Sequence, residues 1–181
     1  MKAGLGDWGN KDSEDILRGL DFTLERYDYC DPNRVYVTGA SYGGHMTNVL
    51  VTQTDRFRAA IPQVGSSNFY SFIGTSEMAF HFLPIQLGIK DMWEDEETLL
   101  RLSPIRYARN VKTPVCILHS EEDYRVPVEQ GEEWYRALTH LGVETRFVRF
   151  KGENHHLSRR GRPKSRIRRL QEIVNWFSQH K

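Results

Sequence analysis

Four short apolar runs, each six residues long, are spread along the chain. They are rich in β-branched and aromatic residues, and glycine, proline or polar residues bound them. Short apolar runs of this kind are typical of parallel strands that are covered on both faces. We therefore expect strands at residues 34–39, 59–64, 114–119 and 145–150.

Between these runs, apolar residues recur at the three- and four-residue spacing of amphipathic helices. The expected apolar faces are Ile16, Leu17, Leu20, Leu24 and Tyr27 after a cap at Asp12 or Ser13; Trp134, Leu138 and Leu141 between Glu129 and Gly142; and Ile167, Leu170, Val174 and Phe177 near the end. A further helix, residues 42–52, directly follows the first strand. This alternation predicts an α/β fold with a mainly parallel sheet flanked by helices.

Two segments depart from the simple alternation. Pro62 lies within the second run, where a central strand would lose a hydrogen-bond donor. Either that strand is shorter than the apolar run, or a bulge lies there. Residues 69–109 mix aromatic side chains with an acidic cluster and show no regular pattern, so we expect an excursion from the sheet with short helices.

Composition narrows the class of protein. The chain has 181 residues, 39% apolar and 27% charged, which suits one folded domain over residues 1–181. Its net charge of +1 argues against a dedicated nucleic-acid binder. We expect no membrane span and, from residues 1–10, no signal peptide. Two cysteines, Cys30 and Cys116, exclude a disulfide scaffold, so we expect a reduced, cytoplasmic protein.

The strongest chemical signal is Gly39-Ala40-Ser41-Tyr42-Gly43-Gly44, which lies between a predicted strand and a predicted helix. It fits G-x-S-x-G, a tight turn that exposes a serine at the carboxyl end of a strand. Gly39 and Gly43 provide the small neighbours that such a turn needs, and Gly44 lets the helix pack closely. A serine alcohol also needs a base to become a good nucleophile.

Two later loops carry candidate partners for Ser41, and each follows a predicted strand. The loop after residues 114–119 contains three acids that could orient a histidine: Glu121, Glu122 and Asp123. The loop after residues 145–150 contains His155 and His156, either of which could be the base. Position alone does not choose within either set. The order serine, acid, histidine is that of α/β-hydrolases.

Two other functions compete with acyl transfer. Seven of the eleven residues 159–169 are Arg or Lys, a cluster that could bind nucleic acid or another polyanion. The apolar residues interleaved with them favour a helix whose arginines face solvent, so we expect no nucleic-acid partner. His119, Glu153, His155 and His156 could suggest a metal site, but they lack H-E-x-x-H spacing, and we expect no metal.

Taken together, residues 39–44, 119–127 and 152–163 resemble the catalytic domain of the prolyl oligopeptidase family. The closer likeness is to its acylaminoacyl-peptidase branch. Residues 6–15, which contain Gly6-Asp7-Trp8-Gly9, and residues 103–114 add to the likeness. It runs in order along nearly the whole chain, which makes it more specific than any single motif.

The resemblance implies an α/β-hydrolase fold and a serine peptidase that cleaves short or N-acylated peptides. It implies that Ser41 is the nucleophile, Asp123 the triad acid and His155 the base. The backbone N–H of Tyr42 would hold the oxyanion, and Arg125 would lie near the substrate. No cofactor or metal is implied. A carboxylesterase, or an idle fragment with a binding or structural role, remains the alternative.

The chain also departs from the family pattern. By the resemblance, the first strands of the hydrolase sheet, a His-Gly-Gly segment with a second oxyanion donor, and a β-propeller are expected upstream of Met1. We therefore expect the strand before Ser41 to be an open edge, which is prone to association with a second copy or with a missing half. With one oxyanion donor absent, we also expect weak activity from this chain alone.

Overall fold

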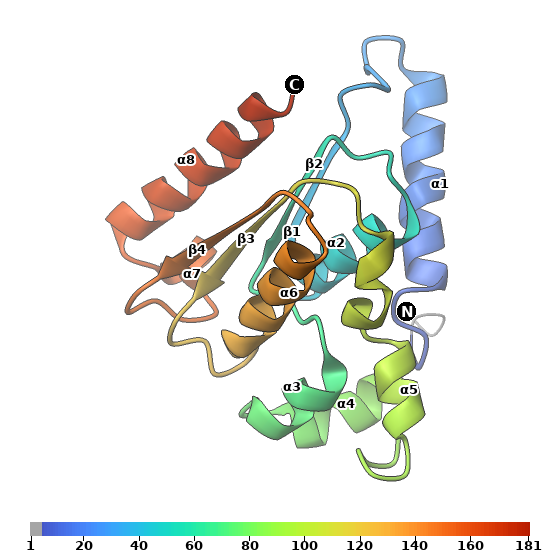
Figure 1. Cartoon of the computed structure of the whole chain (residues 1–181), viewed down its shortest axis with the longest axis vertical. Helices are drawn as coiled ribbons and strands as arrows, with labels where there is room; N and C mark the ends of the chain where they lie inside the picture. Colours follow the sequence, from blue (N-terminus) through green and yellow to red (C-terminus); the bar gives the residue numbers. More distant parts are fainter. Residues whose placement is uncertain (1–4) are drawn as a thin grey trace.

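The computed structural model describes residues 5–181 and contains one parallel sheet of four strands in the order β1-β2-β3-β4. The strands are β1 (Tyr36–Ala40), β2 (Ala59–Gln63), β3 (Val115–Ser120) and β4 (Thr145–Phe150). All four predicted strands are present, displaced by at most two residues at an end, and the predicted parallel α/β fold is confirmed (Figure 1).

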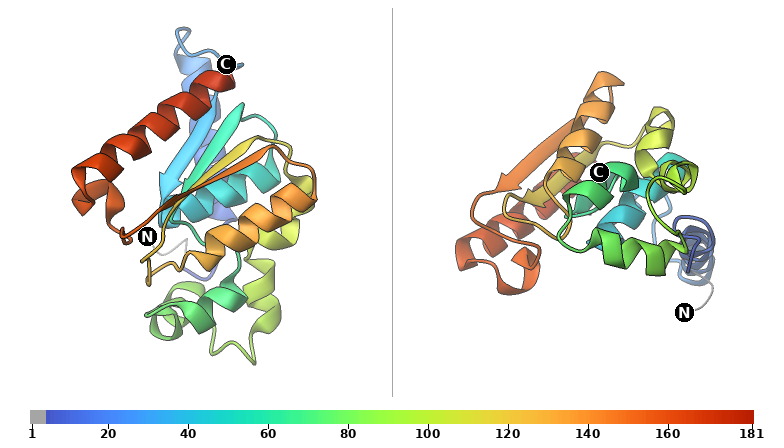
Figure 2. Two further views of the ribbon diagram at one scale, coloured as in Figure 1. Left: turned by 60° about the vertical axis from the view of Figure 1, so that its left-hand side comes forward. Right: turned by 90° about the horizontal axis from the view of Figure 1, so that it is seen from below.

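Helices cover both faces of the sheet, because alternate residues of each strand point to opposite sides. One face packs against α1 (Lys11–Arg26), α2 (Tyr42–Gln53) and α6 (Glu129–His140), and the other packs against α8 (Pro163–Gln179). On β3, Val115 and Ile117 face Trp134 of α6, whereas Cys116 and Leu118 lie in the cluster with Trp176 of α8. Figure 2 shows α8 on the side of the sheet opposite α6, with the short helix α7 (Leu157–Arg160) beside it.

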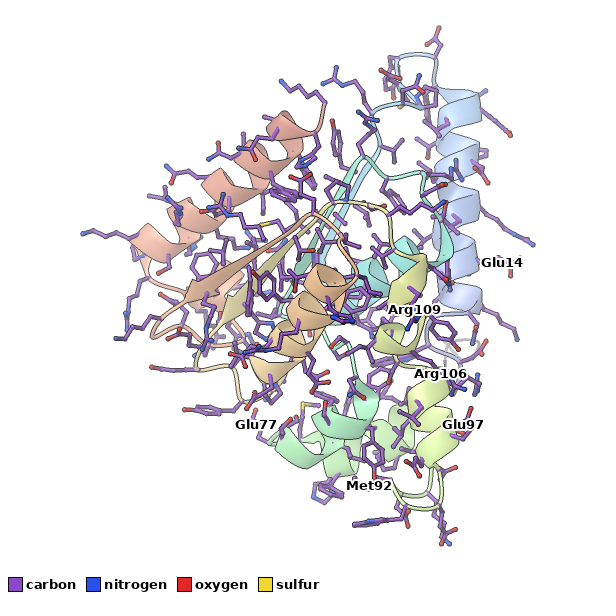
Figure 3. All side chains as sticks on the ribbon, in the orientation of Figure 1. Glu14, Glu77, Met92, Glu97, Arg106 and Arg109 are labelled. Atoms are coloured by element: carbon purple, nitrogen blue, oxygen red, sulfur yellow. The ribbon has the colours of Figure 1, made fainter. Side chains whose placement is uncertain are left out.

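The irregular region forms the predicted excursion of short helices beyond the carboxyl ends of the strands (Figure 1). Its helices are α3 (Phe69–Thr75), α4 (Ala79–Leu87) and α5 (Glu96–Arg101), and the 3-10 helix η2 (Pro104–Asn110) leads back to β3. The excursion has its own apolar cluster, with Phe69, Leu83 and Leu99 at its centre. Arg106 of η2 pairs with Glu97 of α5 at 2.6 Å (Figure 3).

Of the two alternatives expected at Pro62, the structure has a shorter strand: β2 ends at Gln63, one residue before the end of the apolar run. It runs through Pro62 without a bulge. The register pairs Ala60 with Val115 and Gln63 with Leu118, an unchanged offset on either side of the proline. The Ala60 N–H bonds to β3, and the nitrogen of Pro62 faces the same way, because alternate residues of a parallel strand bond to the same neighbour. The strand therefore forgoes one ladder bond to β3 while its side chains stay buried.

Of the four residues of the predicted apolar face of α8, Phe177 packs on the core as predicted and the other three do not. Ile167, Leu170 and Val174 are 58%, 56% and 62% exposed, whereas Glu172 and Trp176 are buried. The face of α8 that meets the sheet carries Trp176, Ile173 and Phe177. Glu172 lies on the same face, and its buried carboxylate pairs with Arg146 of β4 and Arg168 of α8 itself. The partner on β4 explains how a charged residue can be buried there.

The expected cap of α1 was also wrong, since Asn10 occupies the N-cap position. Asp12 lies in the first turn, where its carboxylate accepts the N–H groups of Gly9 and Ser13 at 2.8 Å each. The Ser13 hydroxyl donates to the carbonyls of Gly9 and Asn10. Within the expected apolar stripe, Leu17 and Leu20 pack on the core.

No helix among residues 5–181 has the length and apolar character needed to cross a membrane.

Candidate active site

Ser41 lies in the turn between β1 and α2, in a backbone conformation that residues other than glycine rarely adopt. Its φ is 61° and its ψ is −121°, and its N–H donates to the Gln63 carbonyl oxygen at 2.9 Å. A residue held in such a region costs roughly 1–3 kcal/mol, which the surrounding structure must offset. The strained turn places the Ser41 hydroxyl at the carboxyl end of the sheet.

Close backbone contacts maintain this turn. A Cβ added at Gly39 would overlap the carbonyl of Gly43, and one added at Gly44 would overlap the Gln63 carbonyl oxygen. Gly44 therefore lets α2 pack against the end of β2, as predicted. The role assigned to Gly43 was wrong, because a Cβ there would meet no atom within 4 Å from elsewhere in the fold.

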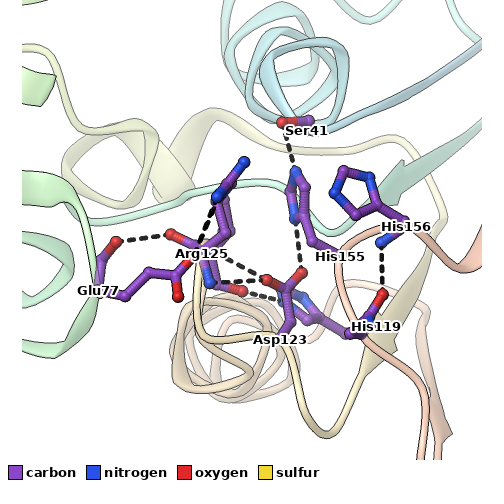
Figure 4. A network of polar contacts seen from close by, with 10 residues as sticks. Ser41, Glu77, His119, Asp123, Arg125, His155 and His156 are labelled. Carbon is purple, nitrogen blue, oxygen red and sulfur yellow. Dashed lines mark hydrogen bonds and ion pairs between the residues drawn. The ribbon is translucent and has the colours of Figure 1, made fainter.

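The ends of three strands bring Ser41, His155 and Asp123 together (Figure 4). The Ser41 Oγ lies 2.8 Å from His155 Nε2, and His155 Nδ1 lies 2.7 Å from Asp123 Oδ2. Ser41 follows β1, Asp123 follows β3 and His155 follows β4. Because parallel strands end at one edge of the sheet, residues that are 114 and 32 positions apart in sequence meet there.

The Asp123 carboxylate is buried and accepts hydrogen bonds on both oxygens. Its Oδ1 accepts the backbone N–H groups of Arg125 at 3.1 Å and Val126 at 2.9 Å, and its Oδ2 faces His155. An acceptor arrangement of this kind keeps one carboxylate oxygen aimed at the imidazole. This geometry assigns the proton of His155 to Nδ1 and leaves Nε2 to accept the Ser41 hydroxyl.

The competing acids and the second histidine lie elsewhere. Glu121 pairs with Arg149 of β4 at 3.1 Å. The backbone N–H of Glu122 donates to the Glu153 carbonyl. His156 lines the same cavity as Ser41, but its ring lies 5.9 Å from that of His155, centroid to centroid, at 75°. Of each candidate set, the structure brings Asp123 and His155 to Ser41.

Tyr42 begins α2, so its backbone N–H has no partner within the helix. Its hydroxyl donates to Asp12 Oδ2 at 2.5 Å. Burial raises the pKa of Tyr42, and the hydrogen bond to Asp12 raises it further, so the phenol stays protonated. Sequence reasoning missed this use of Asp12; the pairing joins residues 30 apart, and no local pattern encodes it.

A cavity of about 310 Å³ opens beside Ser41. Its apolar wall comes from the first segment of the chain, the excursion and the loop after β3: Trp8, Phe69, Phe72, Met78, Phe82 and Val126. Arg125 and Arg159 also line it, and Arg125 pairs with Glu77 at 3.1 Å (Figure 4). A larger hollow of about 560 Å³ beside η2 contains none of the three residues that meet at Ser41.

Three other titratable side chains, His45, His119 and Cys116, are buried and uncharged. Burial lowers the pKa of His45 to about 4, although the Ser66 carbonyl opposes this. Burial also lowers the pKa of His119 and raises that of Cys116 to about 12, which makes Cys116 an unreactive thiol. Within residues 5–181, no three His, Cys, Asp or Glu side chains are grouped to hold a metal ion.

Comparison with known proteins places this geometry in a family. The profile of the prolyl oligopeptidase family matches residues 1–181. The uncharacterized peptidase YuxL of Bacillus subtilis is 49% identical over 180 residues, 99% of this chain and 27% of that protein. The acylamino-acid-releasing enzyme of Arabidopsis thaliana is 31% identical over 97% of this chain and 23% of its own length.

Solved structures agree with these relatives. The acylaminoacyl peptidase of Pyrococcus horikoshii superposes with a TM-score of 0.94 at 35% identity, and the match covers 98% of this chain and 29% of that one. The chain thus has the α/β-hydrolase fold and spans less than a third of the length of the proteins it matches. The resemblance drawn from the motifs is confirmed: the chain belongs to the prolyl oligopeptidase family.

Proposed function

We propose that the chain carries the catalytic serine, acid and base of a peptidase that transfers acyl groups to water. The observation that carries this proposal is the hydrogen-bonded line from Ser41 through His155 to the buried Asp123, which ends in an apolar cavity. Membership of a family whose matched members include an acylamino-acid-releasing enzyme supports it.

The proposed reaction has two steps. In the first, Ser41 Oγ attacks the carbonyl carbon of the substrate while His155 Nε2 takes the hydroxyl proton. Asp123 orients the ring and stabilises the imidazolium, which then protonates the departing amine, leaving an acyl-enzyme. In the second, water attacks the acyl carbon and gives a proton to His155 Nε2, which passes it to Ser41 Oγ as the bond from Ser41 to the acyl group breaks and the acid leaves. The backbone N–H of Tyr42 is the proposed donor to the oxyanion.

The proposed substrates are short peptides, including those with a blocked amino terminus. A solved acylaminoacyl peptidase, 36% identical to this chain, was determined in complex with Z-Gly-Gly-Phe-chloromethyl ketone. The cavity beside Ser41 has the apolar wall that an apolar side chain next to the scissile bond requires. We assign Arg125 to the substrate side, since it lines the cavity and Glu77 holds it there.

We further propose that the 181 residues alone turn over peptides slowly. The family pattern places a second oxyanion donor in a segment outside this chain, and loss of one such donor typically costs about 100- to 1,000-fold in rate. Reaction of Ser41 with an activated covalent probe depends less on that donor than peptide hydrolysis does. Covalent labelling therefore tests the proposed nucleophile more directly than peptide turnover.

A fluorophosphonate probe tests the proposed function. We expect it to label the folded chain once, and Ser41→Ala to abolish labelling. Ser158→Ala is the matched control, because it removes a hydroxyl three residues from His155 in sequence. His155 itself is hydrogen-bonded to Ser41 and Asp123, so labelling of this variant should equal that of wild type. A folded wild-type chain that the probe does not label, or a Ser41→Ala variant that it labels equally, contradicts the proposal.

The edge of the sheet at β1 is the proposed site of association. β1 is an outer strand, as predicted, so one row of its backbone donors and acceptors faces away from β2. Nearby on α1, Ile16 and Phe22 are 43% and 63% exposed. We propose that a further strand pairs there, either from a second copy or from a longer chain of the length seen in the relatives.

A further inference from the structure

His119 is a polar residue in an apolar row. On β3, Val115 and Ile117 point toward α6 and pack with Trp134, and His119 is the next residue of the same face. Its side chain is 1% exposed. An apolar side chain such as leucine would fit this row at a lower cost of desolvation. A buried imidazole at its last position therefore indicates that its hydrogen bonds have a role.

The contacts of His119 point to the loop that carries Asp123. Its Nε2 lies 2.8 Å from the Val126 carbonyl oxygen and 3.9 Å from Asp123 Oδ2. A carbonyl accepts, so this Nε2 carries the hydrogen. The Val126 N–H in turn donates to Asp123 Oδ1. The imidazole of His119 thus holds the Val126 end of the turn that begins at Asp123 (Figure 4).

The surroundings keep this ring neutral and leave it little room to move. Burial outweighs the opposing effects of Asp123 and Glu129, while the nearby His155 also disfavours a charge on His119. A neutral ring matters, because an imidazolium at this distance would compete with His155 for the carboxylate. Across the ring, α6 approaches so closely that a Cβ on Gly131 would lie 2.9 Å from His119 Nδ1.

From this geometry we infer that His119 is a positioning residue for the proposed peptidase reaction: its Nε2–H holds the Val126 carbonyl so that the Asp123 carboxylate stays aimed at His155. The inference rests on the proposed function of the three residues at Ser41. His119 touches no substrate and lies outside the cavity lining. Its removal should lower kcat and leave KM unchanged, because substrate contacts are untouched while the base loses its alignment.

Two amide variants separate this role from packing. In His119→Gln the side-chain nitrogen reaches the place of Nε2 and can still donate to Val126, whereas in His119→Asn it is one methylene too short. A misplacement of about 1 Å in a catalytic group costs up to about 100-fold. We therefore expect His119→Asn to lower kcat for a p-nitrophenyl ester about 10- to 100-fold, and His119→Gln to stay within about threefold of wild type.

The same samples give a readout that does not depend on turnover. The proton shared by His155 Nδ1 and Asp123 should appear as a low-field resonance in the proton spectrum, assigned by its loss in His155→Ala. We expect His119→Gln to retain it and His119→Asn to broaden or shift it. Ile117→Val, two residues earlier in the same row, is the control for packing: it should change thermal stability while kcat and the resonance stay unchanged.

The outcomes separate the two proposals. If wild type shows the resonance but neither hydrolyses the ester nor reacts with a fluorophosphonate, the proposed function fails and the spectra still decide the role of His119. A folded His119→Asn with wild-type kcat and an unchanged resonance overturns the inference, as does a wild-type chain without the resonance. If His119→Asn does not fold, Gly131→Ala replaces it as the test, because its methyl group would displace the His119 ring. We then expect a lower kcat and a broadened or shifted resonance in Gly131→Ala. A wild-type kcat and an unchanged resonance in that variant overturn the inference.

Discussion

At the scale of single residues, the turn around Ser41 depends on how closely backbones approach one another. Gly44 touches the Gln63 carbonyl, the same oxygen that accepts the Ser41 N–H. The sequence predicted a glycine-dependent turn from the spacing alone. It was wrong about Gly43, because whether a Cβ meets a neighbour depends on segments that are remote in sequence.

Two adjacent glycines of α2 make a matched test. Gly44→Ala should destabilise the fold by roughly 3 kcal/mol or more, since its methyl group meets backbone that cannot yield. Gly43→Ala should be neutral or stabilising by up to about 1 kcal/mol, because alanine favours helices and the site is open. Urea unfolding of both variants checks this; equal effects would contradict the contact described at Gly44.

His45 makes the stability depend on pH. Its pKa is about 4 in the folded chain against 6.5 for an ordinary histidine, so between these values the unfolded state binds the proton and the folded state does not. Stability is complete above about pH 6.5 and falls as the pH drops toward 4, by on the order of 3 kcal/mol. Urea unfolding at pH 7 and pH 5 should show the loss.

Variants attribute this pH dependence to His45. His45→Gln should flatten the fall in unfolding free energy between pH 7 and pH 5, because glutamine does not titrate. His140→Gln is the control, since His140 is exposed at the end of α6 and should leave the dependence as it is in wild type. A steep fall that persists in His45→Gln would assign the effect to another group, such as the buried His119.

At the scale of elements, the strands and the apolar face of α6 were predictable, and most of the face of α8 was not. Every strand has an apolar run that can be recognised locally, and each run is present as a strand. For α8, hydrophobic spacing favoured Ile167, Leu170, Val174 and Phe177 as the buried face, yet only Phe177 packs on the core and the other three are exposed. The helix turns inward the face that bears Glu172, whose partner Arg146 comes from β4, and spacing within one helix contains no information about that partner.

Two isoleucines of α8 test the observed face. Ile173 packs with the cluster beneath the helix, and Ile167 is exposed. We expect Ile173→Ala to lower the free energy of unfolding by about 1–3 kcal/mol and Ile167→Ala to change it by less than about 0.5 kcal/mol. A larger destabilisation by Ile167→Ala than by Ile173→Ala in thermal or urea unfolding would contradict the observed face of α8.

At the scale of the whole molecule, the order of the strands determines both where Ser41, Asp123 and His155 meet and which strand is left at the edge of the sheet. Parallel strands with right-handed crossovers bring every following loop to one side, which is why loops after β1, β3 and β4 meet. The same order leaves β1 on the outside, beside exposed apolar residues of α1. A site built at one end of a sheet thus coexists with a surface prone to pairing.

Association through β1 predicts a concentration-dependent assembly. Sedimentation velocity over a hundredfold range of concentration should show the mass rising from one copy of the chain toward two, since an unpaired strand edge gains backbone hydrogen bonds on pairing. Raised salt should weaken this association little, because the edge contacts are hydrogen bonds and apolar packing rather than ion pairs. A single species of monomer mass at the highest concentration contradicts the proposal.

By itself, the sequence determined the parallel α/β class, the serine turn and the family, because apolar runs and the G-x-S-x-G motif are local signals. From position alone it left three acids and two histidines equivalent. Only the tertiary structure decided which of them reach Ser41, that Asp12 holds Tyr42, and that His119 supports Asp123. Each of these decisions is a contact between remote segments, and such contacts exist only once the sheet has brought its strand ends together.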